Sequence, residues 1–101
     1  MPATGVVKIS KDIPDHFNLY QNYPNPFNPS TRIRFALPEA SNVKIEIYNA
    51  IGQRVAVLVN ETRPTGYFEV NFDASKYASG LYIYRIQTGK FIQSKKMMLL
   101  K

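Results

Sequence analysis

The feature that most constrains this chain is an alternation of apolar and polar residues with a period of two. In TRIRFALP (31–38) and NVKIEIYNA (42–50), an apolar side chain stands at every second position. Successive side chains of a strand point to opposite faces, so each segment predicts a half-buried strand. Further strands are expected in RVAVLVN (54–60), GYFEVNF (66–72), GLYIYRIQT (80–88) and KFIQSKKMMLLK (90–101). Turn residues separate these segments and no helical period is present, which predicts an all-β, immunoglobulin-like antiparallel β-sandwich of about seven strands.

Three prolines stand close together in NYPNPFNPS (22–30). Proline fixes φ near −65° and moves the preceding residue out of the helical region, so this segment is expected to be stiff and extended, close to polyproline II. We expect Tyr23 and Phe27 to attach it to an apolar surface, and Asn25 and Asn28 to bind neighbouring backbone. The segment is therefore predicted to brace the sandwich.

The sequence SGLYIY (79–84) places a tyrosine where a loop enters a strand. This is the setting of a tyrosine corner, in which the hydroxyl of Tyr82 would bind backbone a few residues upstream. Tyr82, Tyr84 and Ile86 would then face the core. Leu81 and Ile83 would lie on the other face, exposed or covered by the proline-containing segment.

Composition excludes several classes of enzyme and metal site. The 101 residues suffice for one domain, and they include no cysteine and a single histidine, His16. Cysteine nucleophiles, thiolate ligands and histidine-rich zinc sites are therefore excluded, and no cofactor or metal is expected. The seven acidic residues are scattered over different predicted strands and turns, so we expect no catalytic pair. The chain contains no apolar run long enough to cross a membrane, so no membrane insertion is expected.

Charge is distributed unevenly along the chain. The net charge is +6, and residues 74–101 carry six basic side chains and no acidic one. This asymmetry favours an anionic partner for the C-terminal part, although lysines also protect edge strands from aggregation. A nucleic-acid binder would need basic and aromatic residues interleaved on one face, which YIYRIQTGKF offers only weakly, and we expect no nucleic-acid partner.

Three stretches in order, NLYQNYPNPFNPSTRIRFALP, VKIEIYNAIGQRVAVLV and GYFEVNFDASKYASGLYIYRIQTGKFIQSKKMMLLK, resemble the C-terminal sorting domain, type A, of proteins exported by the type IX, or Por, secretion system. The resemblance covers residues 17–101. It implies that residues 1–16 are a linker from an upstream cargo protein and that residues 17–101 are the sorting domain.

The family's motifs fall on particular positions of this chain. Those expected to be structural are Tyr23, Pro24, Asn25, Pro26, Phe27, Gly52, Gln53, Gly80, Tyr82 and Tyr84. The resemblance places recognition by the sorting machinery on the C-terminal segment, which we define as Lys95, Lys96, Met97, Met98, Leu99, Leu100 and Lys101.

The resemblance also implies a function without catalysis. In that family the domain directs an attached cargo from the periplasm through the outer membrane of a Gram-negative bacterium, for anchoring at the surface or for release. The implied partners are the outer-membrane translocon and a sortase-like peptidase that often removes the domain, and a homodimer is left open.

The C-terminal segment offers a physical route to such recognition. A last strand can add to the sheet edge of a receptor, with backbone bonds giving affinity and alternate side chains giving selectivity. Met98 and Leu100 would face one side of this strand, and Met97 and Leu99 the other. The simpler alternative is that the strand only contributes to the core.

A carbohydrate-binding or cell-surface adhesion β-sandwich is the alternative function. Seven tyrosines could supply an aromatic binding surface, but the chain has no tryptophan, and Tyr82 and Tyr84 have an explanation in packing.

Overall fold

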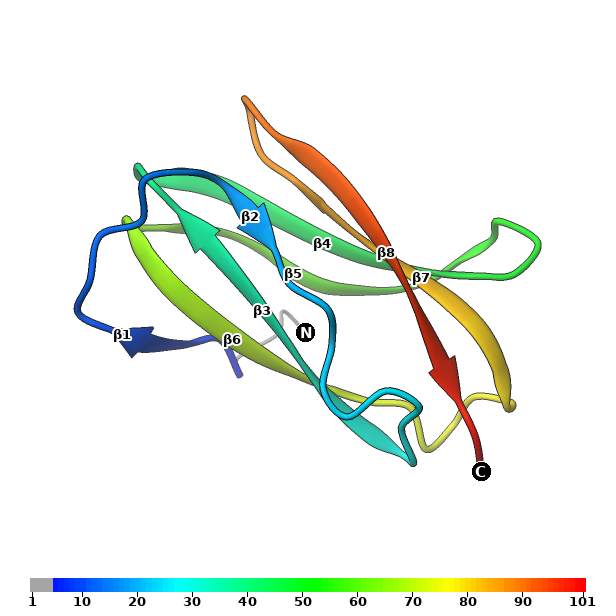
Figure 1. Cartoon of the computed structure of the whole chain (residues 1–101). Coiled ribbons are helices and arrows are strands. Elements are labelled where there is room, and N and C mark those ends of the chain that lie inside the picture. The colour runs from blue at the N-terminus through cyan, green and yellow to red at the C-terminus, as the bar shows by residue number, and fades with distance from the viewer. Residues whose placement is uncertain (1–4) are drawn as a thin grey trace.

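The chain folds into two antiparallel sheets that pack face to face (Figure 1). The computed structural model describes residues 5–101. The strands are β1 (Val7–Ser10), β2 (Asn18–Leu19), β3 (Ser30–Leu37), β4 (Ser41–Asn49), β5 (Arg54–Arg63), β6 (Gly66–Asp73), β7 (Gly80–Gln87) and β8 (Ile92–Leu99). The predicted all-β antiparallel sandwich is confirmed.

Residues 5–101 contain eight strands, where about seven were expected. All six strands read from the alternation occur, as β3 to β8. The two additional strands, β1 and β2, are four and two residues long, too short for a period-two pattern to mark them. β1 lies inside the range 1–16 that the sequence suggested as a linker, and it pairs with β6.

The strands are ordered β1-β6-β3-β2 in the first sheet and β5-β4-β7-β8 in the second. β3 and β6 pair along their whole length, from Ser30 opposite Asp73 to Leu37 opposite Gly66. β7 and β8 form a hairpin, closed by a hydrogen bond from Thr88 N–H to the Phe91 carbonyl (2.8 Å).

The core lies between the sheets and follows the alternation. The side chains of β3, β4 and β7 that the pattern placed inward are buried, and Ile33, Ile45 and Ile86 are completely so. Burying one such side chain contributes about 1.5–3 kcal/mol to stability, so each strand is held by its apolar face. In the part of the chain that the structure describes, no helix is long and apolar enough to cross a membrane.

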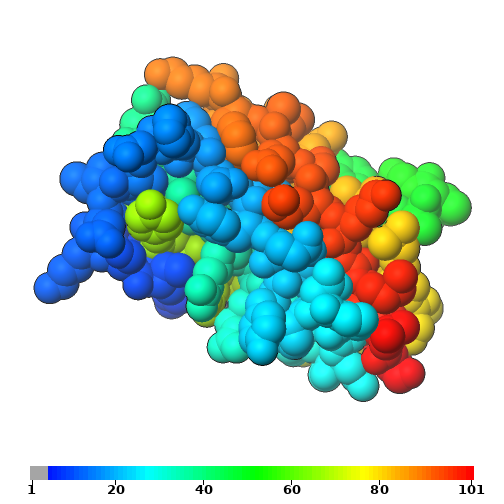
Figure 2. Space-filling view, in the orientation of Figure 1, coloured from blue at the N-terminus to red at the C-terminus, as the bar shows by residue number. Residues whose placement is uncertain are grey.

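Residues 18–27, which we name the crossing segment, join the two sheets along one side. Its first part pairs with β3, where Tyr20 N–H donates to the Arg34 carbonyl (3.0 Å). Its last part lies against β8, where Phe27 N–H donates to the Met98 carbonyl (2.9 Å). Figure 2 shows this segment, in blue and cyan, lying along the orange and red strand β8. The predicted brace is therefore present, across both sheet edges.

Candidate functional site

The C-terminal segment forms the second half of β8 and divides its side chains between two environments. Met97 and Leu99 are completely buried in the core, whereas Met98 is half-buried and Leu100 is 52% exposed. The predicted alternation of these four residues is confirmed. Removing this segment would also remove core side chains, so its structural and functional contributions cannot be separated by deletion.

The lysines of the C-terminal segment lie at its surface. Lys95 is half-buried and Lys96 is exposed. The Nζ of Lys101 donates to the Ser75 carbonyl (2.6 Å), and its backbone N–H donates to Ser79 Oγ (2.9 Å). The chain end is thereby held against the loop between β6 and β7.

The outer edge of β8 is occupied by the crossing segment. Besides the bond from Phe27, Leu100 N–H donates to the Phe27 carbonyl (3.0 Å) and Met98 N–H donates to Asn25 Oδ1 (3.0 Å). Gln21 Nε2 donates to the Lys96 carbonyl (2.7 Å). In the folded domain, a receptor strand could bind this part of the edge only by displacing these contacts.

The proline-containing motif is bent, which corrects the expected polyproline II rod. The Tyr23–Pro24, Asn25–Pro26 and Asn28–Pro29 peptide bonds are cis, and the chain bends at residues 24–26 and 28–29. Phe27 is buried at 2% exposure, as predicted. The prediction for Tyr23 was wrong, because its side chain is 73% exposed.

A buried polar network that the sequence analysis missed fixes this bent motif. The Tyr84 hydroxyl donates to the Tyr20 carbonyl (2.7 Å) and accepts from Asn22 N–H (2.7 Å). Asn22 Nδ2 donates to Thr31 Oγ1 (2.9 Å) and to the Pro24 carbonyl (3.1 Å). Burial raises the pKa of Tyr84 to about 12, and the bond from Asn22 partly opposes this shift.

The second family motif, which includes Gly52 and Gln53, forms the β4–β5 hairpin loop. Asn49 Oδ1 accepts hydrogen bonds from the backbone N–H of Ile51 (3.2 Å) and Gln53 (2.9 Å). Gly52 has φ of +86°, in the region that glycine adopts without strain. The loop presents Ile51, which is 79% exposed, at its tip.

The third motif contains the predicted tyrosine corner. The Tyr82 hydroxyl donates to the Ala78 carbonyl (2.7 Å), four residues upstream, so this prediction is confirmed. Tyr82, Tyr84 and Ile86 face the core, as expected. Gly80 precedes them with φ of +151°.

These separate motifs meet at one end of the sandwich. Gly80 pairs with Leu99, Asn49 pairs with Tyr82, and Phe27 bridges to Leu99. In Figure 1 the green β4–β5 loop, the yellow β6–β7 loop, the cyan proline-containing bend and the C-terminus lie toward the same end. We name this region, made of residues 24–29, 49–53, 74–80 and 98–101, the motif end.

Aromatic rings connect two of these motifs through the core. The ring centroids lie 6.2 Å apart for Phe27 and Phe72, 5.9 Å for Phe72 and Tyr77, and 6.2 Å for Tyr77 and Tyr82. Such pairs contribute about 0.5–1.5 kcal/mol beyond the burial of their area. The first and third motifs are thus part of one packed unit.

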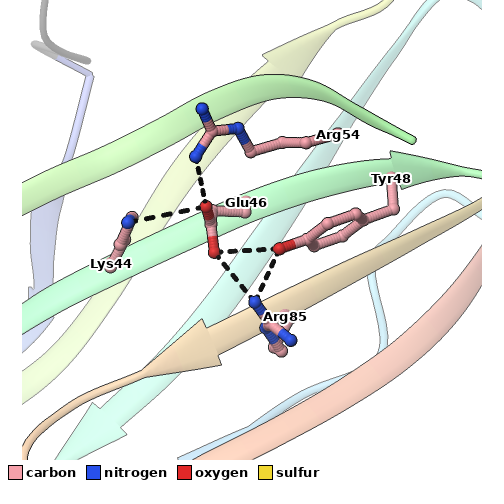
Figure 3. Close-up of polar contacts among 5 residues, drawn as sticks. All are labelled: Lys44, Glu46, Tyr48, Arg54 and Arg85. Carbon is pink, nitrogen blue, oxygen red and sulfur yellow. Dashed lines mark hydrogen bonds and ion pairs between the residues drawn. The ribbon is translucent and has the colours of Figure 1, made fainter. Parts of the chain in front are cut away.

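A second unpredicted cluster surrounds Glu46 on the outer face of β4 (Figure 3). The carboxylate accepts from Arg54 Nη1 (2.9 Å), Arg85 Nη2 (3.2 Å) and the Tyr48 hydroxyl (3.1 Å), with Lys44 Nζ at 3.6 Å. Burial raises the pKa of Glu46, but the three hydrogen bonds and the charge of Lys44 outweigh it and lower the pKa to about 2. In the sequence, the only sign of this cluster was a glutamate between two isoleucines of a predicted strand.

Three of the six basic residues of the last 28 positions are engaged in different contacts within the protein. Arg85 belongs to the Glu46 cluster, Lys90 pairs with Glu39 (2.9 Å), and Lys101 contacts Ser75. Within residues 5–101, no group of three or more histidine, cysteine, aspartate or glutamate residues could hold a metal ion.

Comparisons with known proteins agree with this fold. Among solved structures, the chain is similar to PorZ of Porphyromonas gingivalis, described as an essential bacterial surface component of the type IX secretion system, with a TM-score of 0.56 and 19% identity. The similarity covers 86% of this chain and 12% of the PorZ chain, and at this identity it shows the fold alone. No curated protein matches the chain. The model of the secretion system C-terminal sorting domain matches residues 21–100. This match spans most of the chain, and the protein belongs to the family of secretion system C-terminal sorting domains.

Proposed function

We propose that this domain directs an attached cargo protein through the outer membrane by presenting the motif end to the type IX machinery. Membership of the sorting-domain family carries the conclusion that the domain is a sorting signal for export to the cell surface or the medium of a Gram-negative bacterium. The proposal adds the surface that is read. It also adds the outer-membrane translocon and a sortase-like peptidase as partners, and a cargo joined through the N-terminal part of the chain.

The observation that supports this surface is the meeting of the three motifs and the chain end. Much of what the motifs share is structural, because Phe27, Tyr82 and Tyr84 are buried. Their effect is to fix the bend, the hairpin loop and the C-terminus in one arrangement. Ile51 and Leu100 remain exposed there, at 79% and 52%. These side chains are available to a partner while the fold stays intact.

The covered edge of β8 favours recognition through side chains. The backbone groups of Met98 and Leu100 that point away from β7 already bind Asn25 and Phe27. Strand addition at this position would therefore begin with the loss of three hydrogen bonds. A receptor that contacts Met98 and Leu100 through their side chains avoids that cost.

The domain is proposed to act by binding, without catalysis. The comparisons give no support to the alternative that carbohydrate binding is the function of this family. The homodimer is tested separately, by measuring the oligomeric state of the purified domain in solution.

The test is secretion of a fluorescent cargo that carries an N-terminal signal peptide and ends in residues 1–101, in a host with the type IX machinery. We would compare the unchanged fusion with the double variant Met98→Ser, Leu100→Ser, which leaves Met97 and Leu99 in the core. The control is Val57→Ser, whose side chain is 41% exposed on β5, away from the motif end.

The proposal expects surface or medium fluorescence from the unchanged and control fusions, and periplasmic retention of the double variant. Circular dichroism of the purified domains must show that all three are folded. Equal secretion of the double variant would contradict recognition at the motif end. Periplasmic retention of every folded fusion would contradict the sorting function itself.

A further inference from the structure

A groove of about 460 Å³ crosses the outer face of the first sheet, away from the core. Ile9 and Ser10 of β1 form one wall, and the crossing segment forms the other. Side chains of β3 and β6 lie between them. Figure 2 looks onto this face. Yellow-green atoms at the start of β6 are visible there beside the blue N-terminal residues. We name it the tyrosine groove, after Tyr20, Tyr23 and Tyr67, which line it.

The hydroxyl groups of the seven tyrosines divide into two sets. Those of Tyr48, Tyr77, Tyr82 and Tyr84 each donate a hydrogen bond to a carboxylate or carbonyl oxygen within the protein. For Tyr20, Tyr23 and Tyr67, the described part of the chain offers the hydroxyl no hydrogen-bond partner. These three tyrosines are the ones that line the groove, so their hydroxyls remain available to a ligand.

The arginines show the same division. Arg34, Arg54, Arg63 and Arg85 each form an ion pair with a glutamate. Arg32 is exposed on the groove, and among residues 5–101 no carboxylate lies within ion-pair distance of it. Its guanidinium is a free, bidentate donor for an anionic group.

We propose that the tyrosine groove binds a saccharide that carries an acidic group. The tyrosine rings provide apolar surfaces for the C–H face of a sugar ring, and their hydroxyls provide polar contacts at the edge. Ser10, Asp12 and Gln21 add side-chain donors and acceptors that suit sugar hydroxyls. Arg32 would bind the acidic group. The volume fits a small ligand of one or two sugar rings.

The strands on the floor of the groove offer no open edge to an extended peptide. Peptides that bind sheets commonly pair with an open edge through their backbone. Here β6 pairs with β1 and β3, and β3 pairs with β6 and with the crossing segment. The polar groups that the groove offers are therefore mainly side chains, as in recognition of hydroxyl-rich ligands.

The test is an NMR titration of the ¹⁵N-labelled 101-residue chain with tetragalacturonate, the neutral tetrasaccharide galactotetraose and a tetraglutamate peptide. The variants are Tyr23→Ala, whose side chain is 73% exposed, and Arg32→Gln. The control is Lys76→Gln, which makes the same change of charge at an exposed residue outside the groove.

We expect tetragalacturonate to shift the amides of groove residues more than galactotetraose does. Arg32→Gln should weaken binding about tenfold, the loss of one charge-assisted hydrogen-bonding group, and Lys76→Gln should leave it unchanged. Absence of binding, or preference for tetraglutamate, would overturn the saccharide assignment. Equal binding of the two saccharides would overturn the requirement for an acidic group. Equal weakening of binding by Arg32→Gln and Lys76→Gln would indicate nonspecific charge attraction and would overturn the role of Arg32. None of these outcomes depends on secretion.

Discussion

The Tyr84 hydroxyl connects the second sheet to the crossing segment through the core. Its ring belongs to β7, and its partners are the Tyr20 carbonyl and Asn22 N–H. The bond from Asn22 N–H is buried and the bond to the Tyr20 carbonyl is partly buried, so both groups depend on the hydroxyl as their partner within the protein. Asn22 and Thr31 then fix the bend at Pro24.

Replacing Tyr84 by phenylalanine should therefore destabilise the domain by about 1–3 kcal/mol, because the buried N–H and carbonyl lose their partner. Urea denaturation followed by fluorescence or circular dichroism would measure this change. Tyr67→Phe is the matched control, because its hydroxyl has no hydrogen bond within residues 5–101, and its stability should stay unchanged. Equal stability of the two variants would contradict the assigned role of Tyr84.

Glu46 makes stability depend on acidic pH. Its folded-state pKa of about 2 lies below the ordinary value of 4.5, so its contribution is present above pH 4.5 and is lost as the pH falls toward 2. The contribution should be on the order of 1–2 kcal/mol, since Arg54 is half-exposed and solvent screens the pair. Urea denaturation of Glu46→Gln beside the unchanged protein should show a difference at pH 7 that narrows at pH 3. A constant difference would contradict this linkage.

At the scale of the elements, the crossing segment covers two sheet edges that an open sandwich would leave exposed. β3 and β8 would each present unpaired backbone groups, which invite pairing with other chains. Residues 18–23 pair with β3, and residues 25–27 pair with β8, so one segment covers two edges. β5, at the other edge of the second sheet, contains two register shifts, a feature that also discourages edge pairing.

The side chain of Asn25 should protect one backbone amide on this edge. Met98 N–H donates to Asn25 Oδ1, so Asn25→Ala should raise the hydrogen-exchange rate of the Met98 amide several-fold. The lost bond is exposed and costs about 0.5–1.5 kcal/mol locally, so the amides of the core strands should change little.

Asn28→Ala is the control for this exchange experiment, because Asn28 lies in the same bend and its side chain makes no hydrogen bond within the described range. NMR would follow exchange in both variants. An unchanged Met98 amide in Asn25→Ala would show that the edge is protected by the backbone of Phe27 alone.

At the scale of the whole molecule, the sequence predicted the parts that depend on local pattern. Apolar patterning between turn residues identified β3 to β8, and the position of Tyr82 after a loop predicted its corner. The bend at 24–29 could not be read locally, because its geometry depends on Tyr84, more than 50 residues away. Glu46 likewise needs Arg54 and Arg85 from two other strands, and pairing register sets those contacts.

The same long-range pairing sets two ends of the sandwich apart, so recognition at each end can be tested with its own variant. Ile51 and Ile92 are both exposed isoleucines, at 79% and 58%. Ile51 lies at the motif end, whereas Ile92 pairs with Gln87 at the opposite end of β8. Serine at either position should change stability by less than about 0.5 kcal/mol, because neither side chain is part of the core.

Secretion should nevertheless distinguish these two variants. If the machinery reads the motif end, Ile51→Ser should lower export of the fluorescent cargo, and Ile92→Ser should leave it at the level of the unchanged domain. Surface fluorescence normalised to total fusion protein measures the difference, and thermal unfolding checks that both domains remain folded. Loss of export in Ile92→Ser alone would place the recognised surface at the opposite end. Because the two substitutions are identical in chemistry and both replace an exposed isoleucine, the outcome depends on position in the fold.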